Sequence, residues 1–316
     1  MSCGNSFSVA GGPHGAGSHR GRAVALVCLV CGVMVRAGIA KSDDPAPGAA
    51  DENRAAASEL LKRFDTEFVA VTPGRGVFPK TFRMGSDEGP KSERPARSVM
   101  VGHDFWMARY ELPQNLYAAV LGRNPSAWKG PRNSVEMVTW QEAATFCREA
   151  TRLMRAQKLF GDDVEIRLPT EAEWEYCCRA GSTTAYSFGA AAVGPDDQKN
   201  AASLLDPYAW HTGNAAGNDP PVGAKKPNVW GLYDMHGYLW EFVADVWHGN
   251  YADAPGDAQS WEVDERGGLR VIRGGSWRDR HELLRSSTRW PIPDHARSDA
   301  IGFRCVKAKV RTGRSQ

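Results

Sequence analysis

The sequence predicts a loop-rich α+β fold, and three observations support this prediction. From Phe68 onward, helical periodicity occurs in only three places, each with a clear start signal. Elsewhere, short apolar runs such as residues 105–107 alternate with turns rich in Gly and Pro. After Gly181, more than a hundred residues carry little helical signal. We therefore expect few helices around short strands, with long loops pinned by disulfides, metal ions or buried tryptophans.

The N-terminal segment has the layout of a secretory signal peptide. Residues 1–42 contain no Asp or Glu, and two arginines precede an apolar stretch at 23–35 that is followed by small residues ending in Ala40. We expect a signal peptide over residues 1–40, removed in an exported protein that is periplasmic or secreted. A retained anchor is the weaker alternative, because the apolar stretch is shorter than the about 20 residues of a membrane span.

The next segment, residues 41–66, predicts a linker followed by a short helix over residues 52–64, because its start is rich in Pro, Ala and Asp. A single domain is expected over residues 67–308. The closing residues, 309–316, form a basic tail.

The three helices of the domain have recognisable starts. The first spans residues 113–121, with proline in its first turn and Gly122 beyond its end. The second and third begin at the capping boxes TWQE, residues 139–142, and TEAE, residues 170–173. In each box the Thr and Glu satisfy each other's free backbone N–H groups. The apolar runs that follow, such as residues 269–272, predict short strands between loops.

The amino-acid composition excludes only a few classes of function. The 316 residues are 42% hydrophobic and include 11 tryptophans, so the main part of the chain can bury a large core. The formal net charge of +2 is too balanced to imply nucleic acid as a partner.

Four cysteines lie beyond the predicted signal peptide: Cys147, Cys177, Cys178 and Cys305. None forms a C-x-x-C pair, and adjacent Cys177 and Cys178 are poorly suited to one tetrahedral metal ion. A structural bridge is favoured in an exported protein.

Four motifs resemble, in order, the landmarks of formylglycine-generating enzymes, the sulfatase-modifying factor family. They are RLPTEAEWEY at 167–176, GLYDMHGYLWEF at 231–242, RGGSW at 273–277 and GFRC at 302–305, with weaker matches at 84–86, Glu111 and 124–126. The resemblance implies that family's variant of the C-type-lectin-like fold, with few helices around short antiparallel strands. Enzymes of the family convert a sulfatase cysteine to formylglycine with copper and oxygen.

The resemblance also implies two structural calcium sites. The first takes side-chain oxygens from Asp234 and Glu241 and backbone oxygens from Gly237 and Leu239, an oxygen-rich set that suits Ca²⁺. The alternative is that Asp234 caps a turn and Glu241 is solvated. The second site falls on Asn200, Ala201, Asp206 and Tyr208, where the loop is shorter than in the enzymes.

The cysteines of the family transfer only in part. The resemblance implies a bridge between Cys178 and Cys305, while Cys147 and Cys177 are expected as small apolar residues on helix faces. The oxidising pair, by contrast, is replaced by Asp279 and Leu284. Since a thiolate pair is what binds soft Cu(I), the copper route to formylglycine is not expected.

Two functions remain open for this segment. In the first, the family's substrate groove persists as a recognition surface for a peptide or an anionic saccharide, built from Trp240, Ser276, Trp277, Arg285 and Arg289. The alternative for these side chains is that the tryptophan belongs to the core and Arg285 to a buried ion pair. In the second, Asp279 and His281, with His236 or His295, bind a harder metal for another oxidation. The alternative here is a solvated charged loop.

Overall fold

The computed structural model describes residues 47–215, 219–262 and 268–310, so the predicted signal peptide lies outside the described residues. Its helices and strands are, in chain order, α1 (Pro47–Thr66), β1 (Phe68–Val71), β2 (Thr81–Met84), η1 (Lys91–Glu93), β3 (Arg97–Met100), β4 (Phe105–Ala108), α2 (Gln114–Leu121), α3 (Trp140–Ala156), β5 (Val164–Arg167), α4 (Glu171–Arg179), β6 (Trp240–Val246), β7 (Leu269–Arg273), η2 (His281–Leu283), β8 (Arg289–Pro293), β9 (Ile301–Gly302) and β10 (Val306–Lys309). Among the described residues, no helix has the length and apolar character needed to cross a bilayer.

The helix starts agree with the sequence prediction. Thr139 and Thr170 both form capping boxes, and Gly122 ends α2 in the left-handed conformation. The first helix is longer than predicted, because it begins at Pro47 instead of residue 52. A proline is tolerated there, in the first turn, where its missing N–H has no helical partner.

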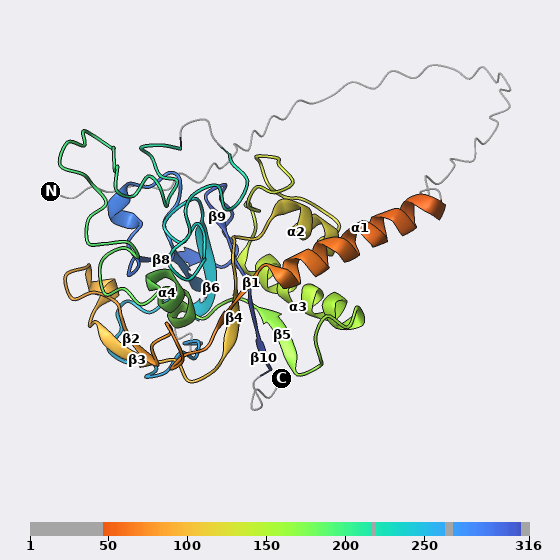
Figure 1. The fold of residues 1–316 in the computed structure, drawn as a ribbon, viewed down its shortest axis with the longest axis horizontal. Coiled ribbons are helices and arrows are strands. Elements are labelled where there is room, and N and C mark those ends of the chain that lie inside the picture. Colours follow the sequence, from red (N-terminus) through yellow and green to blue (C-terminus); the bar gives the residue numbers. More distant parts are fainter. Residues whose placement is uncertain (1–46, 216–218, 263–267, 311–316) are drawn as a thin grey trace, which may run out of the picture. The chain divides into compact units, whose positions relative to one another are not determined.

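A four-stranded antiparallel sheet with the order β1-β4-β10-β5 separates two layers of the fold (Figure 1). In its centre, Met107 of β4 stands opposite Val69 of β1 and Val306 of β10. Successive side chains of a strand point to opposite faces. Phe105 and Met107 accordingly pack with α4, whereas Trp106 and Ala108 pack with α1, α2 and α3.

The second four-stranded sheet carries the motifs of the C-terminal half. Its order is β8-β7-β6-β9, in which β6 pairs antiparallel with β7 and parallel with the short β9. A two-stranded sheet, β2-β3, completes the strand pairing. From residue 181 to residue 239, the described part of the chain has neither helix nor strand; the sequence predicts the lack of helix but not the lack of strands.

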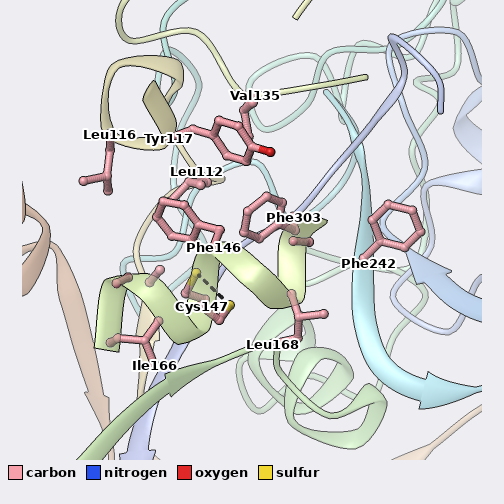
Figure 2. Close-up of a cluster of buried hydrophobic side chains, with 14 of the residues drawn as sticks. Leu112, Leu116, Tyr117, Val135, Phe146, Cys147, Ile166, Leu168, Phe242 and Phe303 are labelled. Atoms are coloured by element: carbon pink, nitrogen blue, oxygen red, sulfur yellow. Dashed lines mark hydrogen bonds between the residues drawn. The ribbon is translucent and has the colours of Figure 1, made fainter. Parts of the chain in front are cut away.

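The core beneath α2 and α3 is aromatic. The ring of Phe146 stacks on Tyr117 with centroids 5.7 Å apart and meets Phe303 edge-on at 5.6 Å (Figure 2). All three side chains are fully buried. Packing of this kind contributes about 0.5–1.5 kcal/mol per aromatic pair beyond the area that it buries.

Buried arginine–glutamate pairs connect the irregular loops to the helices and sheets. Arg273 contacts Glu175, Arg289 contacts Glu171 through two hydrogen bonds, and all four side chains are buried. The first pair joins β7 to α4, and the second joins β8 to the start of α4. Because a buried ion requires a partner, each pair holds its segments in a fixed relation. The sequence analysis expected disulfides, metal ions or buried tryptophans to pin the loops, and it gave a buried ion pair only as the alternative for Arg285.

Candidate functional site

Asp279, at the position where the resemblance implies a first oxidising cysteine, closes a turn. Its Oδ2 accepts hydrogen bonds from the Ser276 hydroxyl (2.6 Å), the Ser276 N–H (2.9 Å) and Trp240 Nε1 (2.8 Å). Asp279 therefore ties the turn after β7 to the start of β6, and the prediction of a solvated loop is wrong for this side chain.

Leu284, at the second position, is a core residue with no exposed surface. It packs with Tyr186 and Leu205 in a small apolar cluster. A Cβ added to Gly275 would lie 2.7 Å from its Cδ1, so the glycine at this point permits the close approach.

The two arginines of the predicted groove are already paired. Arg285 donates two hydrogen bonds to the buried carboxylate of Glu93, at 2.7 and 2.8 Å. Arg289 is buried against Glu171, and its guanidinium lies 4.4 Å from the ring centroid of Trp247. Trp240 is buried as well. The predicted anion-binding groove is therefore not formed by these side chains, and the core alternative holds for Trp240.

The predicted alternative metal ligands lie in different surroundings. His236 is buried, with Nδ1 2.8 Å from the Leu284 carbonyl and Nε2 3.1 Å from the Ser187 N–H, contacts that suit the neutral ring with its proton on Nδ1. Burial lowers the pKa of His236 to about 4. His281 lies 3.6 Å from Glu282, and His295 faces solvent beside Asp294. Within the described ranges, no three His, Cys, Asp or Glu side chains are placed to hold one metal ion.

A pocket of about 210 Å³ lies beside this segment. Three aromatic side chains and three carboxylates take part in its wall. The full lining is Trp128, Ser134, Glu136, Ala215, Asp219, Tyr238, Leu239, Trp277 and Asp299. Of the predicted groove residues, only Trp277 is among them.

The backbone around Tyr238 shapes the pocket. Tyr238 has φ = 72°, in the left-handed region that bulky residues rarely adopt. Its N–H donates to the Trp210 carbonyl, and its own carbonyl accepts from the Trp277 N–H. Its hydroxyl lies 3.1 Å from Asp219 Oδ1 and 2.6 Å from the Pro220 carbonyl. These bonds hold the backbone of Tyr238 in the left-handed conformation, which costs on the order of 1–3 kcal/mol. Backbone strain of this kind concentrates at functional sites.

Glu136 is the least satisfied carboxylate of the pocket. Only 3% of the residue is exposed. One oxygen accepts the Trp128 N–H at 3.0 Å, while Oε2 is buried and has no hydrogen-bond partner. Burial raises the pKa of Glu136, and the nearby carboxylates Asp299 and Asp219 raise it further.

The sequence prediction missed most of this pocket, because its residues come from separate loops. Trp128 follows the weak family match at 124–126, and Glu136 precedes the capping box of α3. These neighbouring landmarks were the available signal. Asp299 precedes the GFRC landmark at 302–305, whereas Asp219 stands in a loop without any such landmark.

The first predicted calcium site fits a cation only in part. Asp234 is buried, its Oδ2 accepts the Gly223 N–H at 2.8 Å, and its Oδ1 has no partner. Burial raises the pKa of Asp234 to about 6. Glu241, by contrast, accepts two hydrogen bonds from Arg304 and one from Trp174, so both of its oxygens are occupied. Asp234, together with backbone carbonyls such as those of Gly237 and Leu239, is what remains for Ca²⁺ in this loop.

The second predicted calcium site is organised around a histidine. Asp206 Oδ1 accepts from His211 Nε2 at 2.7 Å and from Asn214 Nδ2 at 2.9 Å. The ring of Tyr208 stacks on Phe188 at 4.5 Å. Asn200 and Ala201 are in the preceding loop, where the Ala201 N–H donates to Gln198. One of the two Asp206 carboxylate oxygens, Oδ1, is thus held by protein donors.

The cysteines pair differently from the prediction. Cys305 Sγ lies 3.8 Å from Cys147 Sγ, in the aromatic core (Figure 2). Cys178 Sγ lies 3.4 Å from the Met235 carbonyl and 3.8 Å from the His236 ring. All four are free thiols in the structure. The predicted contact between Cys178 and Cys305 is wrong, because α3, and not α4, carries the cysteine that faces Cys305.

The fold is the formylglycine-generating-enzyme type of the C-type-lectin-like fold. A family model described as the sulfatase-modifying factor enzyme 1-like domain matches residues 62–309. The chain belongs to this family.

The chain is similar to proteins that carry different names. It is 27% identical over 225 residues to the chaperone protein LppX of Paenibacillus barcinonensis, covering 61% of this chain and 76% of LppX. It is 27% identical over 213 residues to the formylglycine-generating enzyme of Thermomonospora curvata, covering 64% of this chain and 63% of the enzyme. The structure of PvdO from Pseudomonas aeruginosa matches with a TM-score of 0.62 and 28% identity, covering 77% of this chain and 94% of that one. The chain thus spans less than two thirds of the Thermomonospora enzyme.

Proposed function

We propose that the chain is an exported recognition domain that binds a peptide or protein segment and does not carry out copper-dependent cysteine oxidation. The observation that carries this proposal is the use of Asp279 and Leu284. At the positions of the oxidising pair, one side chain closes a turn through three hydrogen bonds and the other fills the core. Neither can supply the soft sulfur ligands that Cu(I) requires.

The remaining thiols do not offer a substitute. Burial raises the pKa of Cys178 to about 12 and also raises the pKa of Cys177 and Cys305. A thiol with a raised pKa stays protonated at neutral pH and is a poor nucleophile and metal ligand. These cysteines are better explained as structural residues.

The pocket beside Trp277 favours binding as the retained function. It combines aromatic surface with polar side chains, one of which, Glu136, has a buried oxygen without a hydrogen-bond partner, and such a combination is usual in a ligand site. Arg285 and Arg289 are neutralised by Glu93 and Glu171, so an anionic saccharide is the weaker ligand. Export is proposed from the N-terminal sequence pattern alone.

The test combines metal analysis, oxygen uptake and peptide binding on the chain secreted from its own signal segment. We expect no stoichiometric copper or iron, no oxygen uptake with peptide pools, and saturable retention of a subset of an immobilised peptide library. Stoichiometric copper or iron together with oxygen uptake would instead establish an oxidase with a different metal site. A chain that binds no peptide of the library would contradict the recognition function.

A further inference from the structure

We infer that the pocket lined by Trp128, Glu136, Tyr238 and Trp277 binds an organic cation, namely the ammonium or guanidinium group of a basic side chain or a free amine. This inference rests on the proposed recognition function and adds the chemical class of the ligand. It concerns the described lining residues only.

The charge of the pocket is the first argument. Its nine described lining residues include three carboxylates and neither Lys nor Arg. Asp299 is neutralised from outside by Arg278. Asp219 accepts only neutral donors, from Asn133 and Tyr238. Glu136 accepts the Trp128 N–H at Oε1 and is also stabilised by the Ala127 N–H, while Oε2 is buried without a hydrogen-bond partner. An unpaired buried carboxylate is costly, and a cationic ligand would remove that cost.

The aromatic rings are the second argument. A cation placed over the face of tryptophan or tyrosine is attracted by the ring electrons. Trp277 already holds one such cation, since the guanidinium of Arg278 lies 4.7 Å from its centroid. Trp128 lines the pocket although 55% of its surface is exposed, which places a large apolar ring at the mouth. Aromatic rings and carboxylates together are the surroundings that alkylammonium ions prefer.

Other ligand classes fit less well. An anion would face three carboxylates at close range. A hard metal ion needs about six oxygen ligands, whereas much of this wall is aromatic or aliphatic, and the described residues hold no cluster of three potential ligands. The volume of about 210 Å³ is below the roughly 300–1,000 Å³ of pockets for drug-sized molecules, so it suits a head group or one side chain.

The experiment titrates the full mature chain with small probes, following tryptophan fluorescence and heat. The cationic probes are tetramethylammonium, Nα-acetyl-lysine amide and Nα-acetyl-arginine amide. The matched neutral probe is Nα-acetyl-norleucine amide, and the anionic probe is Nα-acetyl-glutamate amide. We expect at least one cationic probe to bind at least tenfold more tightly than the neutral norleucine probe and the anionic glutamate probe. The inference is overturned if no cationic probe binds more tightly than the norleucine probe, or if none of the probes binds.

Two variants locate the site. Glu136→Gln and Trp128→Ala should each weaken the preferred cation at least tenfold. Their matched controls are Glu282→Gln, an exposed carboxylate outside the pocket, and Trp290→Ala, which replaces a tryptophan that is 44% exposed on β8. Trp128→Ala removes an exposed ring, so it keeps the test informative where Glu136→Gln impairs folding. Cation binding that both pocket variants leave unchanged places the cation elsewhere and contradicts the inference.

A further experiment distinguishes a peptide side chain from a free amine as the source of the cation. It also distinguishes failure of the cation pocket from failure of the recognition function. Peptides with an internal lysine or arginine that bind more tightly than the single amides indicate a basic peptide side chain, and equal affinity indicates a free amine. Library peptides retained without regard to basic residues refute the cation pocket but leave the recognition function standing. Copper or iron with oxygen uptake refutes the recognition function, whereas the small-probe titration still decides the chemistry of the pocket.

Discussion

Cys147 and Cys305 face each other across the core, with their sulfur atoms 3.8 Å apart and their side chains buried between α3 and the strand β10. A disulfide needs an S–S distance of about 2.05 Å and Cβ atoms about 3.5–4.5 Å apart, so a small movement of both side chains suffices. In an oxidising compartment this is the pair expected to bridge.

We therefore predict that the oxidised protein contains a Cys147–Cys305 disulfide, with Cys177 and Cys178 remaining free. Peptide mapping of the unreduced protein should identify the cross-linked peptide, and its loss should lower the free energy of unfolding by about 2–5 kcal/mol. The control is Cys177→Ala, which should leave the bridge intact. A cross-link to Cys178 would support the bridge that the family resemblance implied.

The free energy of unfolding is expected to depend strongly on the buried ion pair between Arg304 and Glu241. Arg304 donates to both oxygens of Glu241 at 2.6 Å, and neither side chain has exposed surface. Replacing Arg304 by Met leaves a buried charge on Glu241 without its partner, which costs about 3–5 kcal/mol. Urea unfolding at pH 7.5 measures the loss. The matched control, Arg83→Met, breaks an exposed pair with Asp87 and should cost less than about 1 kcal/mol. Equal effects of the two substitutions would contradict the assigned role.

Local features of the fold were predictable because their causes are local. The capping boxes at Thr139 and Thr170 place their own helix starts, whatever the rest of the chain does. The course of the long loops was not predictable from the same patterns. It depends on contacts such as Arg273 with Glu175 and Arg285 with Glu93, whose members are far apart in the sequence.

Some residues of the candidate site were likewise predictable from the sequence, and others were not. Trp277 belongs to a family landmark and was predicted as a groove residue. Glu136, Trp128 and Asp219 become neighbours only through the tertiary fold, and hydrophobic periodicity carries no information about which loops meet. The arginines of the landmark were misassigned for a related reason. A sequence motif does not show whether the guanidinium of its arginine faces a ligand or a buried glutamate.

Calcium binding is expected to depend on Asp234 and not on Asp206. Asp234 has a buried oxygen without a partner, whereas Asp206 is held by His211 and Asn214. Millimolar Ca²⁺ should raise the Tm of the chelator-treated protein, because a ligand that binds only the folded state stabilises it. Asp234→Asn should abolish this shift, and Asp206→Asn should retain it. A Tm that is the same in Ca²⁺ and in chelator argues against calcium at either loop.

His236 is expected to make stability depend on pH. Burial holds its pKa at about 4, below the ordinary value of 6.5, and both ring nitrogens are engaged by the Leu284 carbonyl and by Ser187. Between pH 6.5 and pH 4 the unfolded chain binds a proton that the folded chain does not. The contribution of His236 to stability therefore rises with pH across this window and is fully present above it, with a total of about 3 kcal/mol. The buried carboxyl groups of Asp234 and Asp245, whose pKa values are raised, act in the opposite direction, so only the difference between variants isolates the effect of His236.

Urea unfolding at pH 7.5, 5.5 and 4.5 tests this dependence through the difference between variants. His236→Gln should be less stable than the parent protein at pH 7.5, and the gap between them should shrink as the pH falls, because the substitution removes the titrating group. His295→Gln, which replaces an exposed histidine, should follow the parent at every pH. A gap for His236→Gln that stays constant from pH 7.5 to pH 4.5 would show that His236 is not kept neutral by the fold. The neutral ring accepts the Ser187 N–H at Nε2, and protonation of this nitrogen removes the acceptor, so protonation is expected to loosen the Ser187 contact first.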